Sequence, residues 1–309
     1  MAYQSGNVVV CGQCVQAAWS WMLSCMSPRP STDCAVCIYD EKKWRSGSAW
    51  NFLDTEDLIV SAIGSLYLAS LLCGATELLG MVHGGCAPAV VVWGEGLDLD
   101  ARSVIDNSRR FRHALSEHLA FWTRLAAARS SLQSSQWAST LPNLQPEDKG
   151  PDGLFASVGD DVELEVQEIK SSTGNPSSKI ARAEFRQSGH VRMPSGGTKT
   201  GRLLEDLWLF ENGVVGFLRL DKLTSDLCTS LGLTTTQYFR VGLASRCRYN
   251  AIVVAGRDYS SVELFEGYQH VTGEVGRRVA TYIGSRQWGA FAEGIRNLVK
   301  RALQRAGVW

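Results

Sequence analysis

Residues 151–170 read PDGLFASVGDDVELEVQEIK, and this stretch decides the fold of the surrounding chain. Two strand-like runs, 153–158 and 162–170, are separated by the three residues GDD, a pattern typical of a β-hairpin. Folding about that turn brings Asp152 opposite roughly Glu168. The sequence therefore predicts a hairpin that delivers Asp152 to the end of its second strand.

The second strand of this hairpin divides its residues between two faces, because side chains alternate along a strand. Glu168 and Lys170 share a face with every apolar residue of 162–166. Glu163 and Glu165 fall on the opposite face, which we interpret as the solvent face. An apolar strand face that finishes in Glu-x-Lys predicts a site at the strand end. Two carboxylates side by side are unfavourable unless they share a cation, and their oxygens suit Mg²⁺ or Mn²⁺.

The residues PDG at 151–153 and EIK at 168–170, at the end of an apolar strand, resemble the PD-(D/E)xK nuclease superfamily. Restriction endonucleases and many phage-defence nucleases belong to this superfamily. The resemblance covers about Arg102 to Gln187. It implies a mixed α/β fold with a restriction-endonuclease-like core, in which helices flank a central mixed sheet.

The resemblance also implies roles for individual residues. Asp152 and Glu168 would hold a divalent metal, Mg²⁺ or Mn²⁺, together with the main-chain carbonyl of Ile169. Lys170 would position or help to deprotonate the attacking water and would stabilise charge on the phosphate.

Two accessory positions are expected on helices on either side of the hairpin. Glu117 is the best match for the Glu that many members carry on the preceding helix. Gln187 or Arg186 matches the Gln or Arg on the following helix. No Tyr lies four residues after Gln187, which departs from the RecB-like pattern and leaves the subgroup open.

The chain has 309 residues and is 45% hydrophobic, enough for a sizeable core. We expect an α/β N-terminal region at 1–100, of unclear role, and a nuclease-like domain at 101–309 with a basic C-terminal helix. Expected strands are 7–10, 34–39, 89–93, 214–220, 238–243 and 251–254; expected helices are 13–26, 54–73, 102–131, 180–187 and 288–304; expected loops are 134–150 and 192–201.

Charge and hydropathy exclude some classes of protein. Lys+Arg and Asp+Glu are 31 each, which argues against a protein that coats nucleic acid by bulk charge. Residues 276–309 hold seven Arg or Lys against one acid, either as the solvated face of a helix or as phosphate contacts. The uncharged stretch 58–76 is interpreted as a buried helix rather than a membrane span. With no secretory signal at the start, we expect a cytoplasmic protein with reduced thiols.

Four of the nine cysteines form two CxxC pairs, Cys11 with Cys14 and Cys34 with Cys37. Their spacing fits a tetrahedral structural Zn²⁺ site. Both pairs adjoin apolar runs, where free cysteine packs as a small hydrophobe. Buried thiols are the favoured interpretation; structural zinc and a redox role stay open.

These observations predict metal-dependent phosphodiester hydrolysis, with DNA as the substrate. Family analogy adds an effector role in a restriction or anti-phage system. It also adds a protein partner such as a helicase or another defence subunit. The oligomeric state is open, with a homo-oligomer among the options. The alternative function is a catalytically silent subunit of the same fold that binds nucleic acid or docks a partner.

Overall fold

The structure is a computed structural model that describes residues 6–25, 35–40, 45–52, 57–73, 78, 81, 89–131, 136–139, 142, 152–158, 162–172, 247–255, 278–285 and 287–309. The strands are β1 (Gly6–Val10), β2 (Ala35–Asp40), β3 (Arg45–Phe52), β4 (Ala89–Trp93), β5 (Gln136–Ser139), β6 (Gly153–Val158), β7 (Val162–Ser172), β8 (Cys247–Ala255) and β9 (Arg278–Ser285). The longer helices are α1 (Gly12–Cys25), α2 (Asp57–Leu72), α4 (Glu95–Ile105), α5 (Ser108–Ser131) and α11 (Trp288–Arg305).

Seven of these strands form one mixed sheet in the order β2-β3-β9-β8-β7-β6-β5. Neighbouring strands are parallel from β3 across β9 and β8 to β7. The pairs β2–β3, β7–β6 and β6–β5 are antiparallel. A separate two-stranded sheet pairs β1 with β4. The fold is therefore mixed α/β, as expected.

The predicted hairpin is present as β6 and β7. Val158 pairs with Val162 at the turn, and Gly153 pairs with Gln167 at the far end. One more step of this register sets Asp152 against Glu168, and the Asp152 amide donates to the Gln167 carbonyl over 3.0 Å. The placement of Asp152 beside the end of β7 is thereby confirmed.

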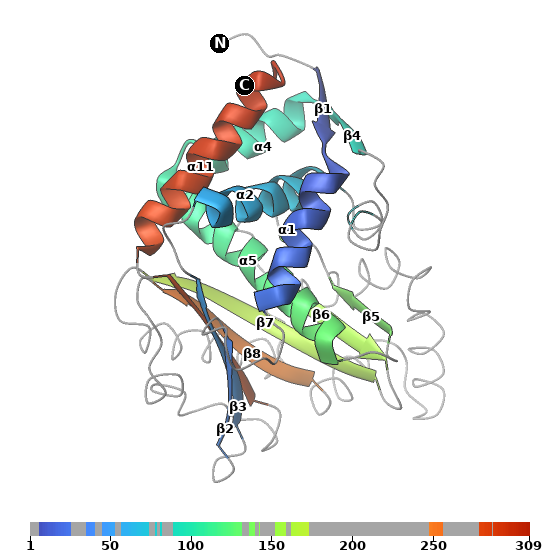
Figure 1. The fold of residues 1–309 in the computed structure, drawn as a ribbon, viewed down its shortest axis with the longest axis vertical. Helices are drawn as coiled ribbons and strands as arrows, with labels where there is room; N and C mark the ends of the chain where they lie inside the picture. Colours follow the sequence, from blue (N-terminus) through green and yellow to red (C-terminus); the bar gives the residue numbers. More distant parts are fainter. Residues whose placement is uncertain are drawn as a thin grey trace, which may run out of the picture.

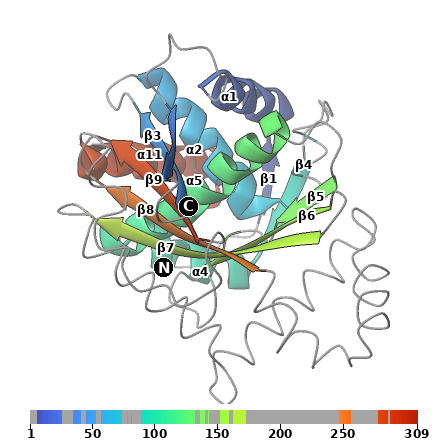
Figure 2. The ribbon, with the colours of Figure 1, turned by 90° about the horizontal axis from the view of Figure 1, so that it is seen from below.

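The helices α1, α2, α5 and α11 gather on one side of the sheet (Figure 1). Figure 2 shows the same arrangement from below. The described part of the apolar stretch expected as a buried helix forms α2 inside this layer, where Leu66 is fully buried. Within the described ranges, no helix is both long enough and apolar enough to cross a membrane.

Residues before and after position 100 share one core. β2 and β3 join the same sheet as β8 and β9. Helix α2 packs against α11 through small residues, with Gly64 beside Leu298 and Gly294 beside Val60. The expected boundary near residue 100 therefore separates neither two sheets nor two cores.

Two local expectations were wrong, and two strands were not expected at all. The single helix expected at 102–131 is interrupted, because the Asn107 side chain accepts the amide N–H groups of Arg109 and Arg110 and so caps a new helix. The expected loop 134–150 contains β5, which pairs with β6. Strands β3 and β9 were not expected from the sequence. The elements expected at 180–187, 192–201, 214–220 and 238–243 lie outside the described residues.

Candidate metal centre

The candidate centre lies where β7 passes the residue that precedes β6. Oδ2 of Asp152 accepts the backbone N–H of Ile169 over 2.6 Å. This bond continues the β6–β7 ladder by one step, with a side chain in place of a backbone carbonyl. It fixes the Asp152 carboxylate between the positions of Glu168 and Lys170.

The ammonium group of Lys170 gathers the remaining groups. Its Nζ lies 2.5 Å from Glu168 Oε1 and 3.3 Å from Asp152 Oδ2. It also donates to the carbonyl oxygen of Ile169 over 2.9 Å. The two carboxylates, the carbonyl and the lysine predicted from the sequence are therefore together in one place.

Burial makes this cluster electrostatically demanding. Glu168 is 1% exposed, and the side chain of Asp152 is 16% exposed. The pKa of Asp152 is raised to about 6, because burial and the nearby Glu168 together outweigh the opposing charge of Lys170 and the hydrogen bond from the Ile169 amide. A divalent cation held between the carboxylates would lower the pKa of Asp152, as the ammonium group does, and more strongly because it carries two positive charges.

The donor set fits a hard metal ion. In the part of the chain that the structure describes, no three His, Cys, Asp or Glu side chains group as metal ligands. The candidate set is instead the carboxylates of Asp152 and Glu168 with the Ile169 carbonyl. Mg²⁺ commonly uses only one or two carboxylates and completes its shell with water, so this oxygen set suits it.

The opposite face of β7 carries a second polar cluster that the sequence did not reveal. Glu165 is 3% exposed, so its expected place on a solvent face was wrong. It pairs with Arg124 of α5 over 3.0 Å. It also accepts hydrogen bonds from Gln167 at 2.9 Å and from Asn250 of β8 at 2.8 Å. Because the helices cover this face, its charges are buried and paired.

This second cluster adjoins the candidate centre through Gln167. The Gln167 carbonyl accepts a hydrogen bond from the Asp152 amide, and the Gln167 side chain donates one to Glu165. A Cβ at Gly153 would lie 2.6 Å from Gln167 Oε1, so the glycine permits the close approach. Strand parity assigned Gln167 and Glu165 to the same face, but only the neighbouring helix and strand supply the further partners of Glu165, Arg124 and Asn250.

Of the accessory positions, Glu117 alone falls within the described residues. Glu117 is buried on α5, the helix that packs on β7. Its carboxylate is close enough to Tyr67 of α2 to add to the rise that burial causes in the pKa of that phenol. Gln187 and its alternative Arg186 lie outside the described residues. The roles of all three stay predictions.

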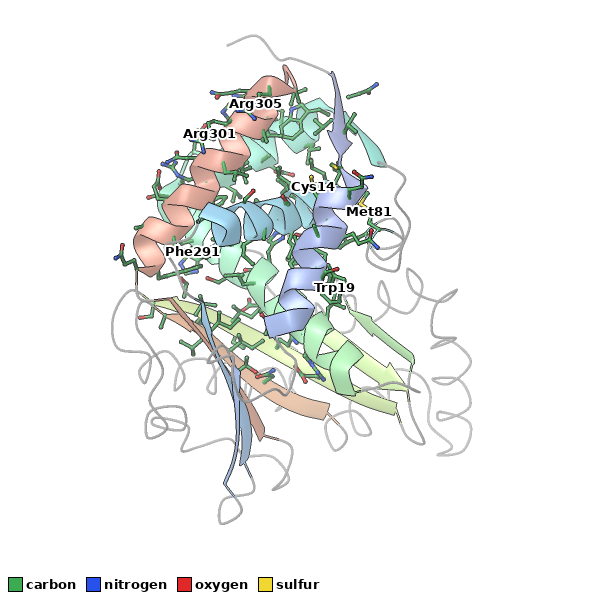
Figure 3. All side chains as sticks on the ribbon, viewed as in Figure 1. Cys14, Trp19, Met81, Phe291, Arg301 and Arg305 are labelled. Atoms are coloured by element: carbon green, nitrogen blue, oxygen red, sulfur yellow. The ribbon has the colours of Figure 1, made fainter. Side chains whose placement is uncertain are left out.

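The cysteines were predicted to pack as buried thiols, and for Cys11 and Cys14 this was wrong, because both are exposed. They lie at the start of α1, where the Cys14 amide donates to Cys11 Sγ over 3.4 Å (Figure 3). Cys37 belongs to β2, the edge strand at the other end of the molecule (Figure 1). Cys34 is outside the described ranges. The described cysteines do not assemble into one zinc site.

The basic residues of α11 divide into two groups. Arg296 pairs with Glu293 and donates to the carbonyl of Ile105, and Lys300 pairs with Asp106 over 2.6 Å. These cations hold α11 against the end of α4. Arg301 and Arg305 are exposed on the same helix (Figure 3). The helix thus has a solvated basic face, and part of its charge serves tertiary structure.

No protein-family model matches the chain, and a search of curated proteins finds no match.

Proposed function

We propose that this chain is a metal-dependent nuclease that hydrolyses phosphodiester bonds, with DNA as its substrate. The observation that carries the proposal is the convergence of Asp152 Oδ2, Glu168 Oε1 and the Ile169 carbonyl on one cation, the Lys170 ammonium. Hard oxygens gathered round a positive charge are the donor set that Mg²⁺ or Mn²⁺ takes. The mixed sheet with helices against it supports the proposal at the level of a mixed α/β fold.

Each residue would have a definite task. Asp152, Glu168 and the Ile169 carbonyl would hold the ion, which when bound supplies Lewis-acid polarisation of the phosphate and lowers the pKa of a bound water. Lys170 would orient the attacking water and balance the charge that develops on the phosphate oxygens. Glu117 and Gln187 would be accessory residues. The role of effector in a restriction or anti-phage system, alongside a helicase or similar subunit, rests on family analogy.

The direct test is cleavage of supercoiled plasmid in Mg²⁺ or Mn²⁺. We expect nicked or linear product from the wild type and loss of at least about a hundredfold in rate for Glu168→Ala and Lys170→Ala, as for other transition-state contacts. Glu293→Ala removes a half-exposed acid on α11 and serves as the matched control with wild-type cleavage. Equal rates in all four proteins would refute the assignment.

One observation favours the alternative, a catalytically silent subunit. Lys170 already satisfies the three oxygens, as a purely structural ion cluster would. A silent subunit would shift DNA or a partner protein in a gel without cleaving it, and Glu168→Ala would leave that binding unchanged.

A further inference from the structure

The Lys170 ammonium lies where a metal ion would have to lie. An ammonium group carries three donors, and Nζ donates to Glu168 Oε1, Asp152 Oδ2 and the Ile169 carbonyl. These are the same three oxygens assigned above to the metal. We propose that Lys170 is the resident cation of this site and caps it, so that a divalent ion enters only by displacing the ammonium group. The inference rests on the proposed function and adds a form of regulation to that site.

On the side of the three oxygens where Nζ lies, the distances leave no room for a metal ion beside the ammonium group. Nζ lies 2.5 to 3.3 Å from the three oxygens. Mg²⁺ requires contacts of about 2.0–2.1 Å to its oxygen ligands. An ion that touched all three oxygens from that side would therefore overlap the space of Nζ. Two cations in that space would also repel one another, so metal binding at this site is an exchange of one cation for another.

Displacement does not require the scaffold to change. The lysine stem is flexible, and its head group is a compact charge with rotatable donors. The backbone of Lys170 stays paired with Val253 of β8. Asp152 keeps the Ile169 amide as a donor and its own amide bond to Gln167. Rotation about the side-chain bonds of Lys170 is therefore sufficient to open the site.

The cap has two opposing consequences for the protein. Without metal, the ammonium offsets the repulsion between two carboxylates that are largely removed from water. With metal, the same ammonium is a competitor that weakens the apparent affinity. A variant without this charge should therefore be less stable without metal and bind metal more tightly.

Titration calorimetry with Mn²⁺ on the metal-free full chain tests the cap. Lys170→Met keeps the length of the stem and removes the charge, and we expect it to bind Mn²⁺ at least about tenfold more tightly than the wild type, within the usual range of coupling between two sites. Lys300→Met is the matched control, since Lys300 lies on α11 and pairs with Asp106 at the end of α4. It should bind Mn²⁺ as the wild type does.

A thermal unfolding series gives a second readout. Lys170→Met should melt below the wild type without Mn²⁺, and saturating Mn²⁺ should raise its Tm by more than that of the wild type. If Lys170→Met does not fold, Lys170→Gln removes the charge and keeps hydrogen bonding to the carboxylates.

The outcomes separate this inference from the proposed function. Mn²⁺ binding that is equal or weaker in Lys170→Met overturns the cap and leaves the metal-dependent nuclease intact. Binding by Lys170→Met alone supports the cap in its strongest form. Absence of Mn²⁺ binding in both proteins overturns the cap and the metal site together.

Discussion

The backbone amide of Ile169 donates to Oδ2 of Asp152 over 2.6 Å, although the two residues are seventeen positions apart. The same oxygen lies 3.3 Å from Lys170 Nζ. One carboxylate oxygen therefore closes the end of the β6–β7 ladder and contributes to the candidate metal centre. This atom has both a structural role and a proposed role in metal binding, and substitutions of Asp152 can test the two roles separately.

Two substitutions of Asp152 should differ in stability and agree in metal binding. Asp152→Asn keeps an oxygen that accepts the Ile169 N–H, whereas Asp152→Ala leaves that amide without its acceptor. We expect Asp152→Ala to be less stable than Asp152→Asn by about 1–3 kcal/mol, the cost of an unmade buried hydrogen bond. Both should bind Mn²⁺ much more weakly than the wild type. Urea unfolding and calorimetry measure the two effects, and equal stability would show that the Asp152–Ile169 bond contributes nothing.

Gly153→Ala should destabilise the protein by about 1–3 kcal/mol, as overpacking of a filled site does. The new Cβ would lie 2.6 Å from Gln167 Oε1, and that side chain is held by its bond to Glu165. Shortening the neighbour in the double variant Gly153→Ala, Gln167→Ala should make the two costs less than additive. Additive costs would contradict the clash.

Gly294→Ala is the matched glycine substitution, and its effect should have the opposite sign. Its Cβ would lie 3.6 Å from Val60 Cγ1, an ordinary contact, within helix α11. Alanine is favoured over glycine in a helix interior by up to about 1 kcal/mol. Thermal unfolding should show a raised Tm for this variant, and a lowered Tm would contradict the packing of α11 on α2.

Removing Arg124 should cost about 3–5 kcal/mol of unfolding free energy, because it leaves the Glu165 carboxylate buried without its cation. The double variant Arg124→Met, Glu165→Gln removes the charge as well and should recover most of that loss. Asn250 can still donate to the remaining side-chain oxygen of residue 165. Denaturant unfolding of the wild type, both single variants and the double variant gives the four unfolding free energies of a double-mutant cycle. A double variant as unstable as the sum of the singles would contradict a buried ion pair.

His118 should make stability depend on pH. Burial between the Tyr67 ring and the Ser70 hydroxyl lowers the pKa of His118 from 6.5 to about 3. Between about pH 6.5 and 3 the unfolded chain therefore binds a proton that the folded chain refuses. The contribution to stability is complete above pH 6.5 and falls as pH decreases, by about 1.4 kcal/mol per pH unit within that window.

The comparison of two histidine variants isolates this contribution. His118→Gln should flatten the pH dependence of the unfolding free energy by that slope. His113→Gln, a partly exposed histidine one turn earlier on α5, should retain the wild-type slope. Parallel slopes for His118→Gln and the wild type would refute the assignment of His118 as buried and neutral.

Several elements could be predicted because their signals are local. The β6–β7 hairpin followed from two alternating runs about a Gly-Asp-Asp turn, and its register placed Asp152 at the end of β7. Helix α1 was predicted from its wide apolar face and α2 from an uncharged apolar run. Strand β3, which reads RSGSAWNF, carries no such signal, since glycine and asparagine are depleted in strands. It is a strand because it pairs with β2 and β9.

The two faces of β7 were the main error. The alternation of residues was predicted correctly. The face that carries Glu165 was wrongly interpreted as the solvent face, because a charged side chain can be buried when it is paired. Glu165 finds Arg124 on α5 and Asn250 on β8, partners that lie far along the chain. The sequence contains these residues and gives no sign that they meet.

The hairpin, its register and hence the meeting of Asp152, Glu168 and Lys170 follow from the sequence alone, because a short turn and a two-residue alternation are local constraints. Three features depend instead on contacts made in the folded protein: the Lys170 ammonium lies among the three oxygens, Glu165 is buried, and residues before position 100 complete the same sheet. Those outcomes depend on which distant groups neutralise a buried charge or pair with an open strand edge. The free energy of such contacts is settled between segments that are remote along the chain, once the hydrophobic core has brought them together.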